Sequence, residues 1–304
     1  MKSVCVLLST YNGGQFLEEQ IESLLKQEDI NFTILIRDDG STDETIDILK
    51  NYSKKDSRIK YYLGENVGPA QSFFDLIRCS SLTDYYAFCD QDDVWDSDKL
   101  KCAIEALEKE DNSQPNMYYS NLRIVDKNLN FYRFSHSSPL TQENPYSALT
   151  EDIATGCTVV FNRVAREYAK SSIPEYCSMH DTWIYMICKF FGQCIYDFNA
   201  HISYRQHDNN VVGTYLGKKT IKLYKERLIR LFNRQLQPRY NNAKNFYILF
   251  KDRLKPEDAE KVQLVASYKN SIFSRLKLLL NKEVYASSTS RDIRFRVLIL
   301  LGIV

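Results

Sequence analysis

The chain has 304 residues, 44% of them hydrophobic and 13% aromatic, which is enough apolar material for one large domain or two modest ones. Its eight cysteines are scattered without a C-x-x-C pair, which favours reduced thiols over a disulfide framework. No apolar run approaches the roughly 20 residues that span a bilayer, and Met1-Lys2 leads directly into a predicted strand. We therefore expect neither a transmembrane helix nor a secretory signal.

The net charge of +1 is the sum of two regions with opposite charge. Residues 218–304 contain 20 Lys and Arg against 7 Asp and Glu, a net charge of +13. The first 217 residues contain the remaining 20 Lys and Arg and 32 Asp and Glu, a net charge of −12. An acidic first part and a basic last part indicate two different roles.

Short apolar runs alternate with segments of helical periodicity over the first part of the chain. This alternation predicts right-handed βαβ units and a mostly parallel sheet. The predicted strands are Ser3–Leu8, Phe32–Arg37, Ile59–Leu63 and the run from Tyr85. Polar residues follow each strand, as at the ligand-binding edge of an open α/β sheet. The chain lacks G-x-G-x-x-G and G-x-x-x-x-G-K-[ST], which disfavours dinucleotide oxidoreductases and P-loop proteins.

The fourth predicted strand ends in three carboxylates, Asp90, Asp92 and Asp93. Carboxylates this close repel one another unless solvent or a cation relieves the repulsion. Hard oxygen ligands on one short segment suit Mg²⁺ or Mn²⁺, which usually also binds substrate phosphates. The structural alternative is an acidic turn before a helix, with Asp96 capping a helix from about Ser97.

The second half of the chain continues the α/β pattern and then becomes helical. We expect strands at 116–125 and 155–161, helices from Arg163 and from His180, two short strands at 195–198 and 201–205, and irregular structure at 128–150. After Gly217 helical periodicity dominates, including residues 221–232, with breaks at Pro238 and Pro256. The pattern therefore predicts a basic helical region at the C-terminus.

Five polar motifs occur along the first 215 residues. They are Ser9-Thr10-Tyr11-Asn12, Asp38-Asp39-Gly40-Ser41-Thr42-Asp43, Asn66-Val67-Gly68, Asp90-Gln91-Asp92-Asp93 and His180-Asp181. In this order and spacing they resemble family 2 glycosyltransferases of the GT-A fold. The segments around Gly68, Trp95 and Trp183 are similar to bacterial rhamnosyltransferases of cell-wall and capsular polysaccharide synthesis.

The resemblance implies an α/β fold with a GT-A-like (Rossmann-like), mostly parallel mixed sheet flanked by helices. The catalytic domain would comprise residues 1–215, and a basic helical region would comprise residues 216–304. The basic region would contact a membrane surface or another copy of the chain. A solvated basic face over a small separate core is the structural alternative.

The resemblance also implies a role for each motif. Asp181 would be the catalytic base, and Asp39 would accept a hydrogen bond from the pyrimidine N3–H. The metal ligands would be Asp92, Asp90 and His207, with Asp92 the direct ligand. The nucleotide-sugar-binding residues would be Thr10, Tyr11, Asn12, Asp38, Asp39, Asn66, Gly68, Asp90, Gln91 and Arg205.

Several of these residues also have a structural interpretation. Asp181 could cap a helix, and one of Asp38 and Asp39 could serve a turn. His207 could be a solvated loop histidine, and Arg205 could pair with a nearby acid. Trp95 and Trp183 are more typical of packing residues than of sugar-binding platforms.

The implied reaction is an inverting sugar transfer that depends on Mn²⁺ or Mg²⁺. The cation stabilises the charge that develops on a leaving diphosphate, and a carboxylate removes the proton of an acceptor hydroxyl. The specific expectation is L-rhamnose transfer from dTDP-L-rhamnose to a growing lipid-linked cell-surface polysaccharide. A lipid-linked acceptor would place the enzyme on the cytoplasmic face of the plasma membrane.

Three other interpretations stay open. The first is a UDP-hexose or UDP-N-acetylhexosamine transferase of the same family. The second is an inactive membrane-peripheral assembly partner, against which the intact Asp90, Asp92 and Asp181 argue. The third is nucleic-acid binding through the basic region, but no recognition motif supports it, so we expect no nucleic-acid partner. Self-association into a homo-oligomer is compatible with every interpretation.

Overall fold

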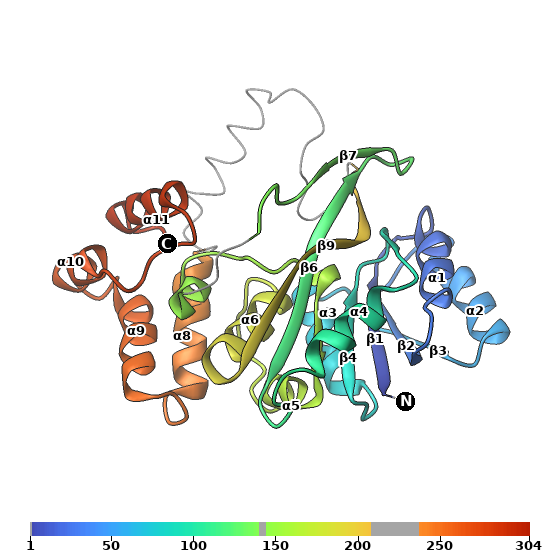
Figure 1. Ribbon diagram of the computed structural model, residues 1–304, viewed down its shortest axis with the longest axis horizontal. Coiled ribbons are helices and arrows are strands. Elements are labelled where there is room, and N and C mark those ends of the chain that lie inside the picture. The colour runs from blue at the N-terminus through green and yellow to red at the C-terminus, as the bar shows by residue number, and fades with distance from the viewer. Residues whose placement is uncertain (1, 140–143, 208–236) are drawn as a thin grey trace.

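The computed structural model describes residues 2–139, 144–207 and 237–304 (Figure 1). The described strands are β1 (Ser3–Thr10), β2 (Asn31–Asp38), β3 (Ile59–Leu63), β4 (Tyr85–Cys89), β5 (Val94–Trp95), β6 (Asn116–Val125), β7 (Phe131–Phe134), β8 (Val160–Asn162) and β9 (Gln193–Arg205). The described α-helices are α1 (Leu17–Leu25), α2 (Thr45–Lys55), α3 (Pro69–Cys79), α4 (Lys99–Leu107), α5 (Arg163–Ser171), α6 (His180–Phe191), α8 (Pro238–Phe250), α9 (Pro256–Ser267), α10 (Ile272–Leu280) and α11 (Thr289–Leu301). Two short 3-10 helices are η1 (Pro145–Leu149) and η2 (Gly156–Thr158).

The described strands form one mixed sheet in the order β3-β2-β1-β4-β8-β6-β9-β5, and β7 pairs with β6. β1 runs parallel to β2 and β4, and β2 runs parallel to β3, as the alternation of strands and helices predicts. β8 pairs antiparallel with β4 and β6, whereas β9 runs parallel to β6 and antiparallel to β5. The carboxyl ends of β1, β2 and β4 therefore meet at one edge of the sheet, where open α/β sheets bind ligands.

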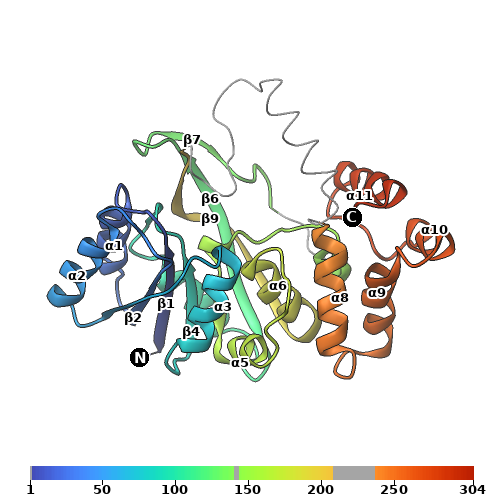
Figure 2. The same ribbon diagram turned by 180° about the vertical axis from the view of Figure 1, so that it is seen from behind.

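Helices cover both faces of the sheet. Val4, Val6 and Leu8 of β1 belong to the same core cluster as α1, α2 and α4, whereas Cys5 and Leu7 belong to the cluster of α3, α5 and α6. Figure 2 shows α3, α5 and α6 together on the near side of the sheet. Because both faces of β1 are buried, successive residues must be apolar, which explains the continuous apolar run in the sequence.

The C-terminal helices extend the core on the α6 side. The ring of Phe246 in α8 lies edge-on to Trp183 in α6 with centroids 5.4 Å apart, and Phe250 contacts the same indole. Pro238 and Pro256 each occupy the first position of a helix, where the missing N–H needs no partner. The breaks that these prolines predict are therefore the starts of α8 and α9.

Some predicted elements differ from the structure. Residues 155–161, predicted as a strand, form η2 and then β8. The two short strands predicted at 195–198 and 201–205 are one strand that pairs with β6 on both sides of an irregularity, where the register shifts between Asp197 and Ala200. Residues 128–150, predicted as irregular, contain β7 and η1. The helical pattern at 221–232 and the predicted domain boundary after residue 215 lie outside the described residues.

Asp96 does not cap α4, contrary to the structural alternative for the acidic turn. The residue before the helix is Asp98, whose side chain forms no cap hydrogen bond. The carboxylate of Asp96 instead forms an ion pair with Arg123 of β6. This contact attaches the turn between β5 and α4 to the sheet.

Candidate functional site

Three strand ends bring predicted site residues to one edge of the sheet. Thr10 ends β1, Asp38 ends β2, and Asp90 follows β4 directly. Thr10 lies opposite Asp38 in the register of β1 and β2. The polar motifs that follow these strands are therefore neighbours in space, although they are far apart in the sequence.

Gln91 connects the loop after β4 to the loop after β1. Its Oε1 accepts hydrogen bonds from the Thr10 hydroxyl at 2.7 Å and from the Tyr11 amide at 2.8 Å. Its Nε2 donates to the Tyr11 carbonyl at 3.2 Å. Tyr11 is 47% exposed, so these contacts fix the loop while its aromatic ring stays accessible.

Asn12 connects the loops that follow β1 and β2. It has a positive φ of 46°, which asparagine adopts more readily than most residues. Its amide donates to the Ser41 hydroxyl at 2.8 Å, and its Oδ1 accepts from the Thr42 amide at 2.9 Å. In the described structure Asn12 therefore positions the two loops.

Asp38 serves the turn after β2. Its buried carboxylate accepts hydrogen bonds from the amides of Gly40 and Ser41, at 3.1 and 2.9 Å, and from the Ser41 hydroxyl at 2.5 Å. These contacts match the turn role that the sequence leaves open for one of the two adjacent aspartates. Any contribution of Asp38 to a ligand would act through the shape of this loop.

Asp39 is held by Arg37, a residue that the sequence patterns do not single out. The Nε of Arg37 donates to Asp39 Oδ1 at 2.7 Å, and its Nη1 donates to Asp75 at 2.7 Å. The other oxygen of Asp39 accepts from the Val67 amide at 3.4 Å. The side chain of Asp39 therefore has a fixed orientation and a compensated charge.

Asn66 and Gly68 shape the loop that contacts Asp39. Asn66 Oδ1 accepts from the Gly68 amide at 3.1 Å. Gly68 has a φ of 79° and directly precedes α3, so a side chain there would be strained even though no atom lies within 4 Å of the position that a Cβ would occupy. The backbone at Gly68 is therefore uncovered where a side chain would project.

The loop after β4 concentrates negative charge. Burial and the neighbouring charges of Asp92 and Asp181 raise the pKa of Asp90 to about 7. Burial and the charges of Asp92 and Asp90 raise the pKa of Asp93 well above its usual range. Asp92 Oδ2 lies 2.7 Å from Nε2 of His207. Crowded carboxylates beside an imidazole are a chemically suitable set of ligands for a divalent cation.

Arg205 supports this acidic loop from β9. Its buried guanidinium donates to the Asp92 carbonyl at 2.8 Å, to the Lys127 carbonyl at 2.6 Å and to Glu19 at 2.5 Å. The guanidinium carbon lies 4.5 Å from the centre of the Phe16 ring. These contacts hold the loop in place, and a direct contact between Arg205 and a diphosphate stays a prediction.

Lys99 is a charged residue near the site that the sequence patterns do not indicate. Its buried ammonium lies 3.5 Å from the centre of the Trp95 ring, and burial lowers its pKa to about 8. The neighbouring Cys157, Cys89 and Asp93 side chains act against this lowering of the lysine pKa. Lys99 therefore places a basic group beside the acidic loop. No pattern in α4 separates Lys99 from its exposed neighbours, so the sequence carries no signal for it.

Asp181 lies in the first turn of the buried helix α6. Its carboxylate accepts hydrogen bonds from the amides of Thr182, at 2.6 Å, and Gly156. Burial, and next the charge of Asp152, raise the pKa of Asp181 to about 7. A Cβ at Gly156 would lie 3.3 Å from Asp181 Oδ2 and 2.9 Å from His180 Nε2, so a larger residue would crowd this carboxylate. A carboxylate with a pKa near neutrality is suited to act as a general base.

His180 and Asp181 are adjacent in sequence but have different surroundings. The imidazole of His180 stacks on Phe73 with ring centroids 3.7 Å apart and meets the edge of Phe88 at 4.4 Å. Neither ring nitrogen has a hydrogen-bond partner among the described residues. Burial lowers the pKa of His180 to about 3, so its ring is neutral and packs in the core. Trp183 is also buried, as expected of a packing residue.

Arg239, at the start of α8, connects the C-terminal region to Asp181. Both terminal nitrogens of its guanidinium contact the carboxylate of Asp152, one of them at 2.8 Å. Asp152 also accepts a hydrogen bond from the Thr182 hydroxyl at 2.8 Å. Because the charge of Asp152 raises the pKa of Asp181, Arg239 moderates the electrostatic environment of Asp181 through Asp152.

We expect Arg239→Gln to move the pH–rate profile toward higher pH. Loss of the guanidinium leaves the charge of Asp152 uncompensated, which raises the pKa of Asp181 further. A base must be ionised to accept a proton, so the rate would rise at higher pH than in the wild-type chain. The measurement is the turnover rate across pH. Arg239→Lys retains the charge and should shift the profile less, whereas an unshifted profile in Arg239→Gln contradicts the coupling.

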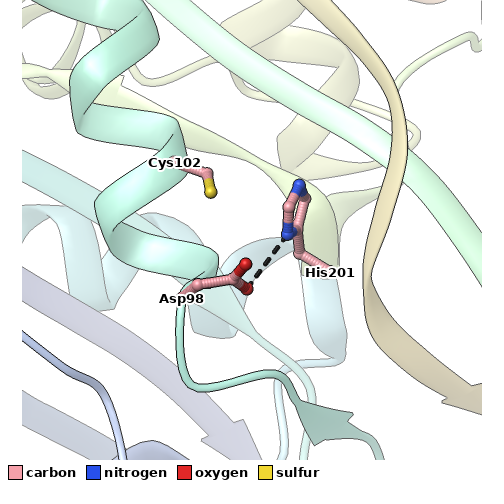
Figure 3. Close-up of side chains that lie close together, drawn as sticks. All are labelled: Asp98, Cys102 and His201. Atoms are coloured by element: carbon pink, nitrogen blue, oxygen red, sulfur yellow. Dashed lines mark hydrogen bonds and ion pairs between the residues drawn. The ribbon is translucent and has the colours of Figure 1, made fainter.

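A second cluster of reactive side chains lies between α4 and β9. Asp98, which directly precedes α4, and Cys102, one turn further along the helix, face His201 of β9 (Figure 3). His201 Nδ1 lies 3.1 Å from Asp98 Oδ1, and its Nε2 lies 3.2 Å from Asp197 Oδ2. A protonated imidazole can donate to both carboxylates. The cluster therefore attaches α4 to β9 through the contacts of the His201 ring with Asp98 and Asp197.

The structure has a mixed α/β sheet with acidic loops at the carboxyl ends of its parallel strands, as expected of a GT-A-like protein. A profile described as "Glycosyl transferase family 2" matches residues 5–169, more than half of the chain. The chain therefore belongs to glycosyltransferase family 2, as the resemblance in the sequence implies.

One relative and three solved structures of two proteins are informative. The dTDP-rhamnosyl transferase RfbG of Shigella flexneri is 29% identical over 229 residues, which cover 70% of this chain and 75% of RfbG. A crystal structure of S. aureus TarS covers 100% of this chain and 81% of its own, with a TM-score of 0.58 at 14% identity. The match to the TarS complex with UDP-GlcNAc covers 99% of this chain and 91% of the TarS chain, with a TM-score of 0.55 at 16% identity.

The third solved structure is the mannosyltransferase PcManGT from Pyrobaculum calidifontis in complex with GDP-Man and Mn²⁺. It matches with a TM-score of 0.53 at 15% identity over 98% of this chain and 86% of its own. At these identities the structures establish the fold, and they confirm the GT-A-like prediction. Within residues 2–139, 144–207 and 237–304, no helix has the length and hydropathy needed to cross a membrane.

Proposed function

We propose that this glycosyltransferase moves a sugar from a nucleotide donor to a hydroxyl of a growing cell-surface polysaccharide, with inversion at the anomeric carbon. The main support is the proximity of Asp181, in α6, to Asp90, in the loop after β4. The charge of Asp181 is close enough to raise the pKa of Asp90. A candidate base and a candidate metal-binding loop from distant parts of the chain thus share one site.

The residues in this loop fit Mn²⁺ or Mg²⁺. Asp92 and His207 approach to 2.7 Å, and Asp90 has a pKa raised in part by the adjacent carboxylates. We propose that Asp92, Asp90 and His207 hold the ion, with Asp92 as the main ligand. When bound, the ion would supply positive charge against the leaving diphosphate.

Asp181 is proposed as the catalytic base. With a pKa raised to about 7 by burial and by Asp152, its ionised carboxylate can accept the proton of the acceptor hydroxyl during attack. The hydroxyl oxygen forms the new bond to the anomeric carbon while the bond to the diphosphate oxygen breaks. Attack from the face opposite the diphosphate needs one base and no covalent intermediate.

The nucleotide is proposed to bind at the ends of β1 and β2. Asp39, oriented by Arg37 through a 2.7 Å ion pair, would accept a hydrogen bond from the pyrimidine N3–H. The accessible ring of Tyr11 would contact the base, beside Thr10 and Gln91. The bare backbone at Gly68 and the neighbouring Asn66 would allow the nucleotide to approach closely.

The proposed donor is dTDP-L-rhamnose, since the relative RfbG is described as a dTDP-rhamnosyl transferase and is 29% identical. Transfer with inversion from a β-L-rhamnosyl donor would give an α-L-rhamnoside. A UDP-hexose or UDP-N-acetylhexosamine is the second candidate, because TarS binds UDP-GlcNAc on the same fold. Asp39 would recognise the N3–H of thymine and uracil equally, so the site residues leave both candidates open.

Nucleotide release from a panel of dTDP- and UDP-sugars tests this proposal. We expect release by the purified chain to depend on Mn²⁺ or Mg²⁺ and to be fastest with dTDP-L-rhamnose. Release from a UDP-sugar alone would support the assignment as a glycosyltransferase and contradict the assignment of dTDP-L-rhamnose as the donor. Absence of both release and calorimetric binding across the panel would contradict the enzyme assignment and favour an inactive assembly partner.

The proposed acceptor is a lipid-linked saccharide at the cytoplasmic face of the plasma membrane. This location follows from the chemistry of the acceptor, because a lipid anchor holds the growing saccharide at the bilayer surface. The basic C-terminal region, residues 216–304, is the proposed membrane-facing or self-associating part of the chain.

A further inference from the structure

Helix α10 has two apolar faces, and one of them is exposed. Ile272, Phe273 and Leu280 are 77%, 77% and 74% exposed, and Leu276 lies between them on the same face at helical spacing. Leu278, on the opposite face, is fully buried. Packing within the chain therefore explains one apolar face of α10 and leaves the other without a partner among the described residues.

Helix α11 repeats this arrangement. Its exposed apolar residues occur at i, i+4, i+7 and i+8, which places them on one face, whereas Phe295 and Ile299 on the other face are buried. The exposed residues are Ile293, Val297, Leu300 and Leu301. Both helices lie at the end of the molecule remote from β3 and α2 (Figure 1). Exposed apolar side chains grouped on one helix face, rather than scattered singly, indicate a binding surface.

Basic residues accompany the two faces. Residues 271–304 contain six Lys and Arg and two Asp and Glu. Three of the six basic residues form ion pairs: Lys277 with Glu260, Arg291 with Glu151 and Arg296 with Asp292. Glu283 is paired with Lys261. The segment keeps a net positive charge beside its exposed apolar side chains, as helices that lie in a membrane interface do.

We propose that the exposed faces of α10 and α11 form a membrane-binding surface that inserts apolar side chains between anionic lipid headgroups. A symmetric contact with a second copy of the chain would bury the same apolar residues but would bring like charges together. An anionic bilayer satisfies both the apolar and the basic groups. The choice of a membrane as the partner rests on the proposed lipid-linked acceptor.

The first turn of α11 and the connection that precedes it are attached to the segment beside the candidate base. Arg291 forms an ion pair with Glu151 at 2.6 Å, and Asn144 Nδ2 donates to the carbonyls of Glu283 and Tyr285 at 3.0 Å each. Glu151 directly precedes Asp152, which interacts with Asp181. A membrane bound at α10 and α11 would therefore be coupled to the part of the site that would receive the acceptor.

Vesicle sedimentation with the full chain tests the surface. The probes are vesicles of phosphatidylcholine alone and of phosphatidylcholine mixed with phosphatidylglycerol. We expect Phe273→Ser/Leu280→Ser and Ile293→Ser/Leu300→Ser each to weaken binding to the mixed vesicles by about tenfold or more, because each change removes two large apolar groups from the interface. Leu82→Ser, at a 64% exposed leucine outside this surface, is the control and should bind normally.

Unchanged vesicle binding in both double variants would overturn the proposal. A large fall in their melting temperature would also overturn it, because an already exposed face should contribute little to folding. The proposal would also be overturned if the wild-type chain did not bind vesicles but formed dimers that the variants do not form. A second copy of the chain would then cover the surface. Nucleotide release in solution should survive in every variant. If the wild-type chain binds vesicles but releases no nucleotide, the result contradicts the proposed function and still supports the membrane-binding surface.

Discussion

Asp181→Asn is expected to lower the sugar-transfer rate by about 10²–10⁴-fold, the usual contribution of a general base, while donor affinity changes little. The substitution keeps the size of the side chain but removes its ability to accept a proton. In the wild-type chain the pKa of Asp181 is raised to about 7, so the rate should rise as the pH increases through about 7. The variant should lose this pH dependence. The measurements are turnover across pH and calorimetric donor binding.

Asp84→Asn is a suitable control for the loss of a partly buried carboxylate. Asp84 accepts a hydrogen bond from the Ser3 amide at 2.9 Å at the opposite end of the parallel strands. The Asp84→Asn substitution should therefore leave turnover nearly unchanged. Equal losses of donor binding and turnover in Asp181→Asn would indicate that Asp181 acts mainly as a structural residue of α6.

Asp92→Ala is expected to abolish the metal dependence of turnover and to reduce the rate by about 10²–10³-fold, the loss typical when transition-state charge stabilisation is removed. Asp92 is the acid that meets His207 at 2.7 Å, so its removal also leaves the imidazole without this partner. The measurements are turnover against Mn²⁺ concentration and the thermal shift that Mn²⁺ and a nucleoside diphosphate produce together.

His207→Ala should retain measurable activity and require more Mn²⁺ than the wild-type chain, since both carboxylates of the proposed ligand set remain.

Undiminished, metal-dependent turnover in Asp92→Ala would refute the assignment of Asp92. In that case the neighbouring Asp90, Asp93 and Cys157, whose ligand atoms lie within 4.8 Å of one another, would be the next set to substitute.

The parallel half of the sheet could be predicted from the sequence because burial on both faces leaves a local pattern. The predicted strand Ile59–Leu63 has the observed bounds, and the run from Tyr85 ends before the acidic loop as expected. The strand β9 could not be predicted as one element, because polar residues near Asn199 interrupt its local pattern. Its extended form depends on pairing with β6, which is distant in the sequence.

The same distinction applies to the site. Most of the site carboxylates lie at or just after strand ends, and Asp181 lies in the first turn of a helix, so local motifs predict them. Arg37, Lys99 and Arg239 could not be predicted in this way, because their significance depends on contacts that only the fold creates. Arg239 and Asp152 are 87 residues apart, yet they form an ion pair beside Asp181. The sequence predicts that Arg205 contacts the donor, whereas its described hydrogen bonds hold the acidic loop.

The most direct test of the central claim is anomalous diffraction from crystals of the chain with Mn²⁺ and a dTDP-sugar. We predict one strong manganese peak at the Asp92 carboxylate, adjacent to the diphosphate, with the thymine N3–H on Asp39 and the anomeric carbon facing Asp181. Manganese bound away from Asp92, or a nucleotide bound elsewhere than at the ends of β1 and β2, would contradict the account.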